Sequence, residues 1–590
     1  MCGIAGWLLA PGQARDEAHL RALADAIAHR GPDDRGYFWD PEHGVALAHN
    51  RLSIIDLTPA GHQPLLNESR DVVLTYNGEL YNFVALRLQL EGAGHRFFSR
   101  TDSEVVLRAF IQWGPACVER FCGMFAFAIW SARDHKLFLA RDPLGMKPLY
   151  YTRLPGDQGS VFASEIKAFL ALPDFRPRLN QEAVQQFLEF GYTFDEHTTV
   201  FDGVYKLPPG TSMEVIRGAA RPPRPYFELP RRTAIERPIR EAEEDLYETL
   251  SEVVSEHLVA DVPVGLLLSG GLDSSITAAL AARKTRITTI SMGFAESSLD
   301  ERPYARVVAE HIRSDHREVT IEPQAIRDGI EEVAWYFDDL FADWGTVSTR
   351  MLYAKCREMG IKVVLVGEGS DEIFGGYPIF DTARRLRGPE TWRLFQLYRR
   401  YAGRRHGGQF WRFARMMRKY LRDSGGDWFH AVRLFETRNQ LPNNYVMKVD
   451  KASMSVSVEA RAPFLDRRVV ERAFAMTGDQ LLAPDGSKAV LRSMAERFAL
   501  LPPETTRRPK MGSSMPAGWM DDSASFRAYA KGVILDRDSW VDRLGLRHAM
   551  TAYFDGTRSG YAFPRGISIF SNLAWRLLLL NLWSRRYVRA

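Results

Sequence analysis

The chain opens with the residues MCGIAGW, so a cysteine directly follows the first methionine. Removal of Met1 would give Cys2 a free α-amine next to its thiol. An α-amine with a pKa of about 7.7 to 8 is a base close to neutrality, and a thiol has a reference pKa of about 8.5. The amine can therefore take the thiol proton, and one residue would supply both nucleophile and base. The alternative is a small buried side chain on a first strand, because free cysteine is among the most buried residue types.

A second stretch, VGLLLSGGLDSSITAAL, has the pattern of a strand, a glycine turn and the beginning of a helix. Gly270 and Gly271 allow another group to approach the backbone closely, and Ser274 lies where the helix would present unpaired N–H groups to an anion. No lysine follows the glycines, which excludes a Walker-type loop. Asp273 adds a carboxylate to this phosphate cradle, and its repulsion from a polyphosphate implies an intervening Mg²⁺. The alternative is an ordinary turn with a serine cap.

Acidic residues also follow the apolar run IKVVLV, in the loop GEGSDEIFGGY. This loop carries Glu368, Asp371 and Glu372. Ligands of open α/β sheets bind at the carboxyl ends of the strands. Two acidic loops at two such ends predict that both face one nucleotide, whereas a single acidic loop would be interpreted as a solvated turn.

The elements that would position these residues fall into two blocks. Residues 1–210 contain many short apolar runs separated by turns, which is typical of β-structure with a few helices. Residues 211–240 are rich in proline and arginine, so we expect a linker there. Residues 241–590 alternate short apolar runs with long helical patterns and end in a mostly helical part, which indicates a parallel sheet covered by helices. The chain is therefore predicted to be a two-domain α/β protein.

Composition narrows the classes of function. The chain has 590 residues, of which 45% are hydrophobic and 25% charged, and a formal net charge of +4, so nothing at this level demands nucleic acid or an acidic membrane. No secretory signal opens the sequence, and the apolar run LAWRLLLLNLW is too short to cross a bilayer. The cysteines have no zinc-like spacing and suit a reducing cytosol; they are Cys2, Cys117, Cys122 and Cys356. We expect a cytoplasmic protein.

The succession of SGGLDSS and GEGSDE resembles the ATP-pyrophosphatase domain of glutamine-dependent asparagine synthetases. In that family ATP is split into AMP and pyrophosphate while a carboxylate is adenylated. The resemblance implies that Asp273 and Asp371 bind Mg²⁺. It also implies that Glu368 supports the adenylate and deprotonates ammonia, and that Lys488, otherwise a solvated helix lysine, neutralises charge on the reacting acyl phosphate. The implied ATP site comprises Leu267, Ser269, Gly270, Gly271, Asp273, Ser274, Met292, Val366 and Gly367.

The amino-terminal block resembles the class II glutamine amidotransferases, whose fold is an αββα sandwich of the Ntn-hydrolase type. Six stretches carry the likeness in order: MCGIAG, HRGPDD, NRLSIIDL, YNGELYN, RTDSEV and RDPLGMKPLYY. The resemblance implies that Cys2 attacks the amide of glutamine and that ammonia leaves. The residues implied in the glutamine pocket are Arg51, Ile54, Ile55, Asn77, Gly78, Glu79 and Asp102.

Each of these pocket residues has an implied task. Asn77 and the backbone N–H of Gly78 would stabilise the oxyanion of the tetrahedral intermediate. Arg51 would bind the α-carboxylate of glutamine, and Asp102 with Glu79 its α-ammonium, while the backbone near Ile54 and Ile55 lines the pocket. Taken singly, the Asn-Gly pair would be interpreted as a hairpin turn and the arginine as a surface ion pair.

The two halves imply a shared reaction. Ammonia released into water would protonate and diffuse away, so we expect the domains to pack together and to enclose a passage from Cys2 to Glu368. The expected reaction amidates the side-chain carboxylate of aspartate. The sequence departs from its relatives at Val366, where a serine is common, and in DDLFADWGTVSTR, where Trp344 replaces a small residue near the expected acceptor. The alternative is the same chemistry on another carboxylic acid. A β-lactam-forming cyclase is disfavoured, because such enzymes need no glutaminase cysteine and this chain keeps all the residues implied in the glutamine pocket.

Residues 384–422 interleave arginines with aromatic residues, as RNA-binding surfaces do, and some ATP-pyrophosphatase relatives modify tRNA. The apolar residues fall at helical spacing, however, which favours amphipathic helices with a solvated basic face. A catalytically inactive scaffold is hard to reconcile with so many retained polar groups. We therefore expect glutamine, ATP and aspartate or another carboxylic acid as partners, no nucleic acid, no membrane and, by analogy, a homodimer.

Overall fold

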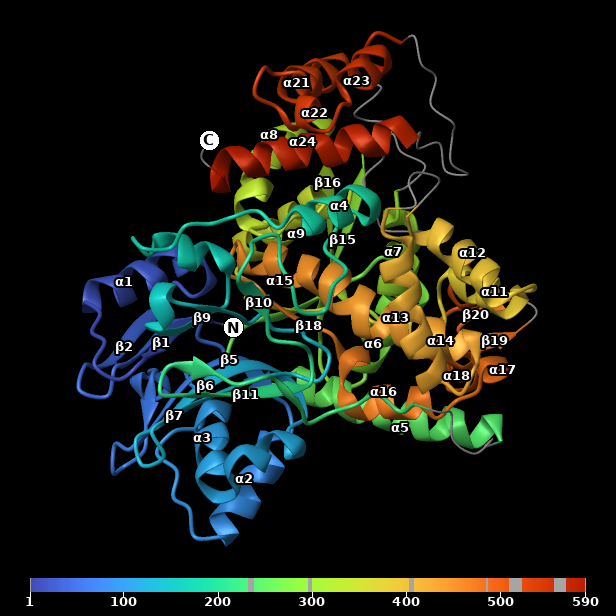
Figure 1. The fold of residues 1–590 in the computed structure, drawn as a ribbon. Helices are drawn as coiled ribbons and strands as arrows, with labels where there is room; N and C mark the ends of the chain where they lie inside the picture. The colour runs from blue at the N-terminus through green and yellow to red at the C-terminus, as the bar shows by residue number, and fades with distance from the viewer. Residues whose placement is uncertain are drawn as a thin grey trace.

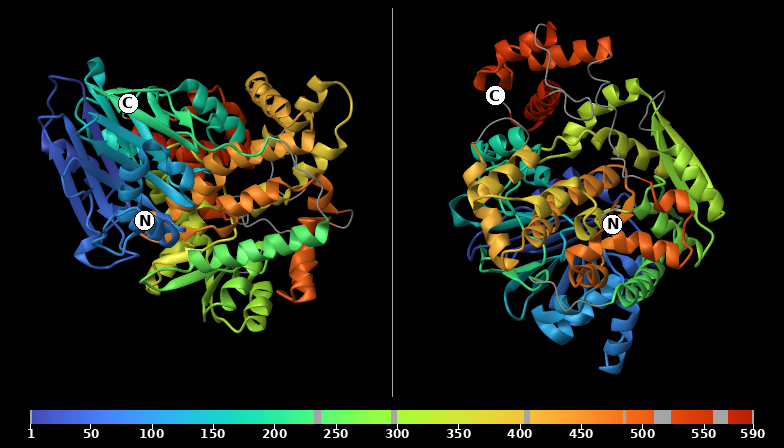
Figure 2. Two further views of the ribbon diagram at one scale, coloured as in Figure 1. Left: turned by 90° about the horizontal axis from the view of Figure 1, so that it is seen from below. Right: turned by 90° about the vertical axis from the view of Figure 1, so that its right-hand side faces the viewer.

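The computed structural model describes residues 2–231, 238–294, 300–402, 408–483, 486–508, 523–556 and 569–588. Within the first 225 residues the strands form two stacked sheets on one side of the molecule, and helices around a third sheet fill the other side (Figure 1). The left view of Figure 2 separates the same two blocks, with the blue strands at one end and the yellow and orange helices at the other.

Both sheets of the amino-terminal domain are antiparallel. The first contains β1 (Gly3–Leu9), β2 (Asp34–Asp40), β3 (Val45–Arg51), β8 (Tyr150–Arg153), β9 (Gly159–Ala163) and β10 (Val204–Lys206). Its order is β10–β8–β9–β1–β3–β2. The second contains β4 (Leu65–Leu66), β5 (Val72–Leu80), β6 (Gly123–Ser131), β7 (Lys136–Arg141), β11 (Thr211–Ile216), β12 (Ala219–Ala220) and β13 (Arg224–Pro225). Its order is β12–β11–β7–β6–β5–β4, with β13 beside β11.

The two sheets pack face to face and are covered by helices. Apolar side chains from both inner faces, such as Ile4 and Trp130, fill the space between the sheets. α1 (Glu17–Ala26) covers the outer face of the first sheet, while α2 (Phe83–Gly92) and α3 (Asp102–Trp113) cover the second. The expected αββα sandwich is confirmed.

The stretch 211–225, which we expected in the linker, belongs to the second sheet of this domain. β11 pairs antiparallel with β7, and Met213 lies opposite Leu139. Alternate residues of β11 are buried, which is the period of a half-buried strand; the surrounding prolines and arginines obscured this signal. We therefore place the domain boundary after Pro225.

The carboxyl-terminal domain is built on a parallel sheet. Its strands are β14 (Val264–Leu267), β15 (Thr288–Phe294), β16 (Asp315–Ile321), β17 (Val363–Leu365) and β18 (Glu459–Arg461), in the order β16–β15–β14–β17–β18. The chain winds outwards through α6 (Leu272–Ala282) and α7 (Arg302–His311) and returns through α8 (Pro323–Tyr336) and α9 (Thr346–Glu358). Right-handed crossovers place these two helix pairs on opposite faces. The winding reverses between β14 and β17, where such sheets hold their ligands.

The rest of this domain is mostly helical, as expected. Its longer helices are α5 (Ile239–His257), α11 (Pro378–Arg385), α12 (Glu390–Ala402), α13 (Phe410–Asp423), α14 (Trp428–Phe435), α15 (Val446–Met454), α16 (Arg467–Phe474), α18 (Ala489–Arg497), α21 (Ala524–Ile534), α23 (Arg547–Phe554) and α24 (Ile569–Tyr587). α24 lies along α8 and α4 (Gln181–Phe190), so the end of the chain contacts both domains (Figure 1). No helix in the described part of the chain is long and apolar enough to span a membrane.

The arginine-rich stretch forms α12 and α13, and its amphipathic character is confirmed. α13 buries Phe413, Met417 and Tyr420 on one face. Its arginines lie outside this face; Arg418, for example, donates to Glu390 at 2.7 Å. Residues 403–407 of this stretch lie outside the described part.

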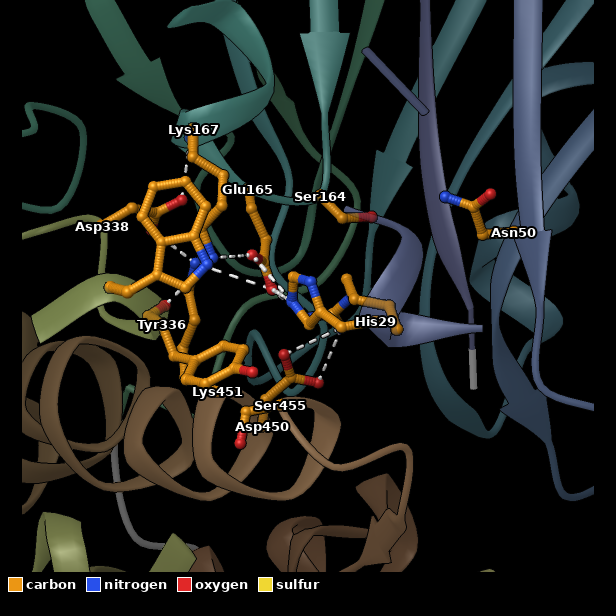
Figure 3. Close-up of polar contacts among 12 residues, drawn as sticks. His29, Asn50, Ser164, Glu165, Lys167, Tyr336, Asp338, Asp450, Lys451 and Ser455 are labelled. Atoms are coloured by element: carbon orange, nitrogen blue, oxygen red, sulfur yellow. Dashed lines mark hydrogen bonds and ion pairs between the residues drawn. The ribbon is translucent and has the colours of Figure 1, made fainter. Parts of the chain in front are cut away.

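A cluster of buried charges closes the seam between the two domains (Figure 3). Arg30 donates to Glu165 Oε1 at 2.8 Å and, across the seam, to Asp450 Oδ2 at 2.9 Å. Lys451 of α15 donates to Asp338 Oδ1 at 2.5 Å and lies 4.0 Å from Glu165 Oε1. Burial removes these ions from water and costs hydration free energy. This cost is offset only while each charge keeps its partners.

Replacing Arg30 with methionine should therefore destabilise the protein. The substitution leaves Asp450 and Glu165 buried with an unbalanced charge, and breaking a buried ion pair in this way costs about 3 to 5 kcal/mol. Urea unfolding followed by tryptophan fluorescence measures the change. The matched control is Arg21→Met, because Arg21 is exposed, pairs with Glu17 on its own helix and lies over the Tyr37 ring. Exposed contacts of these kinds are worth about 1 kcal/mol or less each. Equal losses in the two variants would contradict the role given to Arg30.

Candidate active sites

Cys2 lies directly before β1, an inner strand of the first sheet, and 7% of the residue is exposed. Its backbone nitrogen donates to Oδ1 of Asn77 at 2.8 Å, and its carbonyl accepts from Nε of Arg30 at 3.1 Å. Burial raises the pKa of the Cys2 thiol, and the charge of Glu459 adds to this shift. A thiol in this position therefore needs a nearby base before it can attack. Met1 lies outside the described residues.

Two N–H donors lie beside Cys2 on β5. The Nδ2 atom of Asn77 is buried and has no hydrogen-bond partner among the described residues. Gly78 lies opposite Phe125 of β6, but the N–H and the carbonyl of Phe125 are both bonded to Asp142 instead. Opposed residues of an antiparallel pair exchange either both bonds or none, so the Gly78 N–H points away from β6. These donors can hold an oxyanion.

The guanidinium of Arg51 is held by the loop that follows β3. It donates to the carbonyl oxygens of Asp56 at 2.5 Å, Thr58 at 3.2 Å and Ile55 at 3.3 Å. Gly61 packs against it so closely that a Cβ at that position would lie 1.9 Å from Nη2. The guanidinium is therefore fixed in orientation, which suits a planar ligand such as a carboxylate.

The backbone at Ile54 is hydrogen-bonded to the carboxyl-terminal domain. Its carbonyl accepts from the N–H of Asp261 at 2.9 Å, and the Asp261 carboxylate accepts from the N–H of Asp56 at 2.8 Å. Asp261 belongs to the loop before β14. The pocket loop around Ile54 and Ile55 is therefore tied to the other domain.

Two buried carboxylates complete this site. Asp102 begins α3, and its Oδ2 accepts from the Tyr76 hydroxyl at 3.0 Å and from the Leu80 N–H at 2.9 Å. Glu79 lies on β5, 3.4 Å from Nη2 of Arg461. Burial raises the pKa of both carboxyls. A cation is therefore the ligand that would restore their charged forms.

Sequence reasoning missed Glu459 and Arg461, which β18 brings from the carboxyl-terminal domain to this pocket. Both are fully buried, and Nε of Arg461 donates to Glu459 Oε1 at 2.5 Å. Two opposite charges at alternate positions in the short apolar run SVEARAPF were the available signal, since charges are rarely buried unless paired. Their place beside Glu79 depends on packing between domains, which no local pattern reveals.

The second site lies at the carboxyl ends of β14 and β17. After β14, Ser274 Oγ accepts from the Ser269 N–H at 3.2 Å, and Ser269 Oγ accepts from the Gly271 N–H at 3.2 Å. The two serine side chains therefore hold the loop by hydrogen bonds to its own backbone N–H groups. Leu267 at the end of β14 and Met292 near the end of the neighbouring strand β15 are both half-buried. Their role in an adenosine pocket stays a prediction.

Glycines let the two loops approach each other. Gly270 has a φ of +68°, and a Cβ there would lie 2.4 Å from the carbonyl carbon of Tyr304. A Cβ at Gly367 would lie 2.9 Å from the backbone nitrogen of Ser274. A larger side chain at Gly270 would push its loop away from α7, and one at Gly367 would force the two loops apart.

Asp273 and Asp371 meet at one ammonium group. Lys488 Nζ lies 2.6 Å from Asp273 Oδ2 and 2.7 Å from Asp371 Oδ1. Ser370 donates to the other oxygen of Asp273 at 2.7 Å, and a Cβ at Gly376 would strike Asp371. No group of three or more histidine, cysteine or acidic side chains in the described ranges is arranged to hold a metal. Two carboxylates that share a cation nevertheless fit Mg²⁺, which is commonly bound by one or two carboxylates together with phosphate oxygens.

Glu368 follows β17 and faces a lysine of α15. The Val366 N–H donates to the Arg461 carbonyl at 2.8 Å, so only a backbone bond is made where relatives carry a serine. Lys448 donates to Asp343 Oδ1 at 3.3 Å. Burial lowers the pKa of Lys448, but the charges of Asp343 and Glu368 outweigh it and raise the pKa above its usual value. Glu368, the expected base, thus lies in an acidic loop close to the buried lysine Lys448.

Trp344, the departure near the expected acceptor, packs on the last helix. Its ring stacks on Trp575 of α24, with the centroids 4.5 Å apart and the planes 12° apart. Trp575 also donates from Nε1 to the carbonyl of Ala342 at 3.2 Å. The large side chain therefore anchors residues 338–345, the loop before α9, to α24.

Arg508 is a further residue that sequence reasoning missed. Its Nη1 donates to the Ser269 carbonyl at 3.3 Å, and its guanidinium lies 3.6 Å from the centroid of the Tyr304 ring. A cation at the phosphate loop is favourable for a polyphosphate ligand. Arg508 lies far from SGGLDSS in the chain, so no local sequence pattern indicates this contact.

Known proteins share both halves of this chain. The family model of the glutamine amidotransferase domain matches residues 1–227, and the model of asparagine synthase matches residues 245–585. The chain is 31% identical over 565 residues to glutamine-hydrolyzing asparagine synthetase 1 of Bacillus subtilis (strain 168), covering 88% of this chain and 87% of that protein. It is 30% identical over 549 residues to glutamine-hydrolyzing asparagine synthetase 3 of the same organism, covering 86% of each chain.

A fungal protein with a different name is also similar. The chain is 34% identical over 409 residues to amidase chry2 of Gibberella zeae, covering 64% of this chain and 60% of that protein. Both domain models, their order and the long alignments to the bacterial proteins agree with the architecture described above. The chain belongs to the family of glutamine-hydrolysing asparagine synthetases.

Proposed function

We infer that this protein is a glutamine-hydrolysing asparagine synthetase: it activates the side-chain carboxylate of aspartate with ATP and amidates it with ammonia taken from glutamine. The observation that carries this inference lies beside Cys2. Asn77 holds the Cys2 backbone nitrogen with its Oδ1 and keeps its buried Nδ2 unpaired among the described residues. A buried unpaired donor is costly, and an oxyanion on the substrate would satisfy it.

In the amino-terminal site, loss of Met1 frees the amine that takes the Cys2 proton. The thiolate attacks the amide carbon of glutamine, and Asn77 and Gly78 hold the resulting oxyanion. The protonated amine of Cys2 then gives its proton to the amide nitrogen, and cleavage of the C–N bond leaves a thioester and ammonia. Arg51 orients the substrate by its α-carboxylate. Water then hydrolyses the thioester and releases glutamate.

In the carboxyl-terminal site, the glycine loop after β14 holds the phosphates. The carboxylate of the acid attacks the α-phosphorus of ATP, which gives an acyl adenylate and pyrophosphate. Ammonia attacks the acyl carbon, Glu368 takes a proton from it, and AMP leaves with the amide complete. Lys488 balances the negative charge that develops on the reacting centre. Mg²⁺, held by Asp273 and Asp371, would offset the charge of the polyphosphate.

A passage for ammonia between the two sites stays a prediction, and the seam offers support for it. Arg30 joins the Cys2 carbonyl to Asp450, and a small pocket of about 10 Å³ lies beside Asp450. Its lining comes from both domains and includes Met146 and Met447. A cavity of this size holds about one small molecule. Separate solvent clefts for Cys2 and Glu368, with no interior path, would contradict the passage.

The remaining expectations about partners rest on sequence. The homodimer and the lack of a nucleic-acid partner stay predictions. A carboxylic acid other than aspartate also stays open as the acceptor. The similarity to a protein named an amidase is the observation that favours this alternative.

Cys2→Ala should separate the two half-reactions. With glutamine as the nitrogen source, amide formation should fall at least about 100-fold because the nucleophile is gone. With ammonium chloride it should stay near the wild-type level, measured as AMP released and asparagine formed. Cys122→Ala, a half-buried cysteine of the same domain with no assigned role, serves as the control. Undiminished turnover with glutamine would refute the role of Cys2, and intact-mass analysis of the wild type should show a chain that lacks Met1.

Removal of divalent metal should stop only the ATP-dependent half. EDTA should abolish AMP formation and leave glutaminase activity, measured as glutamate, within about twofold, because Cys2 chemistry uses no metal. Asp371→Asn should weaken Mn²⁺ binding, read by electron paramagnetic resonance in the presence of ATP, at least about tenfold. Asp381→Asn on α11 is the control. Equal Mn²⁺ binding by both variants would overturn the assignment of Asp371.

A further inference from the structure

A cavity of about 360 Å³ lies between α4, α11, α12 and the helical segment Glu436–Tyr445 that joins α14 to α15. Aromatic rings line one part of its wall, contributed by Phe190, Tyr192, Tyr377, Tyr401 and Tyr445. Polar side chains, among them Arg400 and Gln440, line the rest. Cavities of about 300 to 1,000 Å³ with such walls typically hold ligands of drug size. Neither half-reaction described above uses this space.

The cavity adjoins the expected acceptor site. The Tyr377 hydroxyl donates to Glu372 Oε1 at 2.6 Å. Glu372 lies in the short helix α10 (Ser370–Phe374), which begins two residues after Glu368. On the opposite wall, Asn444 and Tyr445 precede Lys448 by four and three residues, so all three lie on one face of the continuous helix. That lysine pairs with Asp343 beside Glu368.

A third contact ties the cavity to the loop that departs from its relatives. Tyr192, in the cavity wall, forms a β-bridge with Phe341, and the Ala342 N–H donates to the Gly191 carbonyl at 2.8 Å. Trp344 anchors this loop on α24, as described above. The cavity wall and the acceptor loop are thus parts of one hydrogen-bonded unit.

Glu436 supplies an independent sign of a ligand. Only 2% of this residue is exposed, and its Oε1 accepts from the Tyr401 hydroxyl at 2.5 Å. Its Oε2 is buried and has no hydrogen-bond partner in the part of the chain that the structure describes. An unsatisfied buried oxygen in a cavity wall costs free energy unless a donor from a ligand completes it.

We propose that this aromatic cavity is an extension of the acceptor site and holds the body of a carboxylic acid larger than aspartate, with an aromatic ring and an amine or hydroxyl donor for Glu436. The acid would place its carboxylate at Glu368 and Lys488 and its ring among the tyrosines, where offset or edge-to-face stacking stabilises it. Aspartate alone is far smaller than the ligands that fill cavities of this volume. The inference rests on the proposed amidation chemistry and extends its range of acids.

The test compares 4-aminophenylacetate with phenylacetate, which lacks the donor, and with aspartate. Ammonium chloride, ATP and Mg²⁺ are supplied so that the glutamine site is not needed, and acid-dependent AMP is measured. We expect 4-aminophenylacetate to have a kcat/KM at least tenfold above that of phenylacetate. Glu436→Leu should reduce this ratio to near one, because the donor then has no partner.

A second variant tests the space itself. Ile379→Trp adds bulk to the cavity wall and should lower the ratio of kcat/KM for 4-aminophenylacetate to that for aspartate at least tenfold. The matched control is Gln396→Trp, which adds the same bulk to the neighbouring hollow beside Trp392 and should leave the ratio unchanged. Unchanged ratios in both Glu436→Leu and Ile379→Trp would overturn the proposal.

Calorimetry separates failure of this proposal from failure of the proposed function. Turnover of aspartate without binding or turnover of either aryl acid overturns the cavity proposal and leaves the amidation chemistry standing. Binding of 4-aminophenylacetate that Ile379→Trp removes and Gln396→Trp keeps supports the cavity as its site. If no acid then yields AMP, the proposed function fails while that binding result stands.

Discussion

Buried charge between the domains is the constraint on which the rest of the molecule depends. Arg30 joins Cys2 and Glu165 in one domain to Asp450 in the other, and Arg461 of one domain faces Glu79 of the other. Ions removed from water lose several kcal/mol of hydration each, which only their partners return. Asp450 and Glu79 each meet their arginine across the seam. The relative position of the two domains is therefore set by charge pairing, and with it the position of each site relative to the other.

Two elements of the carboxyl-terminal domain carry this constraint to the ATP site. β18 reaches the Glu79 pocket with its side chains, while its backbone pairs with β17, whose end leads to Glu368. α15 presents Asp450 to the seam and Lys448 to the neighbourhood of Glu368. β18 and α15 therefore each contribute residues to both the Glu79 pocket or the seam and the surroundings of Glu368.

Local sequence signals predicted the parts of the sites that local structure controls. Glycine turns after apolar runs gave the phosphate loop and the acidic loop at adjacent strand ends, because the carboxyl ends of parallel strands meet at one edge. β11 was missed because prolines and arginines flank a strand of alternating burial. Glu459, Arg461 and Arg508 were missed for another reason: their partners lie far away in the chain, and packing alone brings them together. The sequence therefore predicts elements and loops well and contacts between domains poorly.

The electrostatics of the glutamine pocket explain why it would select a zwitterion. Burial raises the pKa of Glu79 and Asp102, so their ionised forms are disfavoured without a nearby cation. Arg461 meets part of this need at Glu79, at a distance of 3.4 Å. In the role we propose, the α-ammonium of glutamine brings the missing cation, lowers both pKa values and releases any proton that either carboxyl holds. Binding and ionisation then favour each other, and an amide without an α-ammonium would leave Asp102 and Glu79 without this added cation.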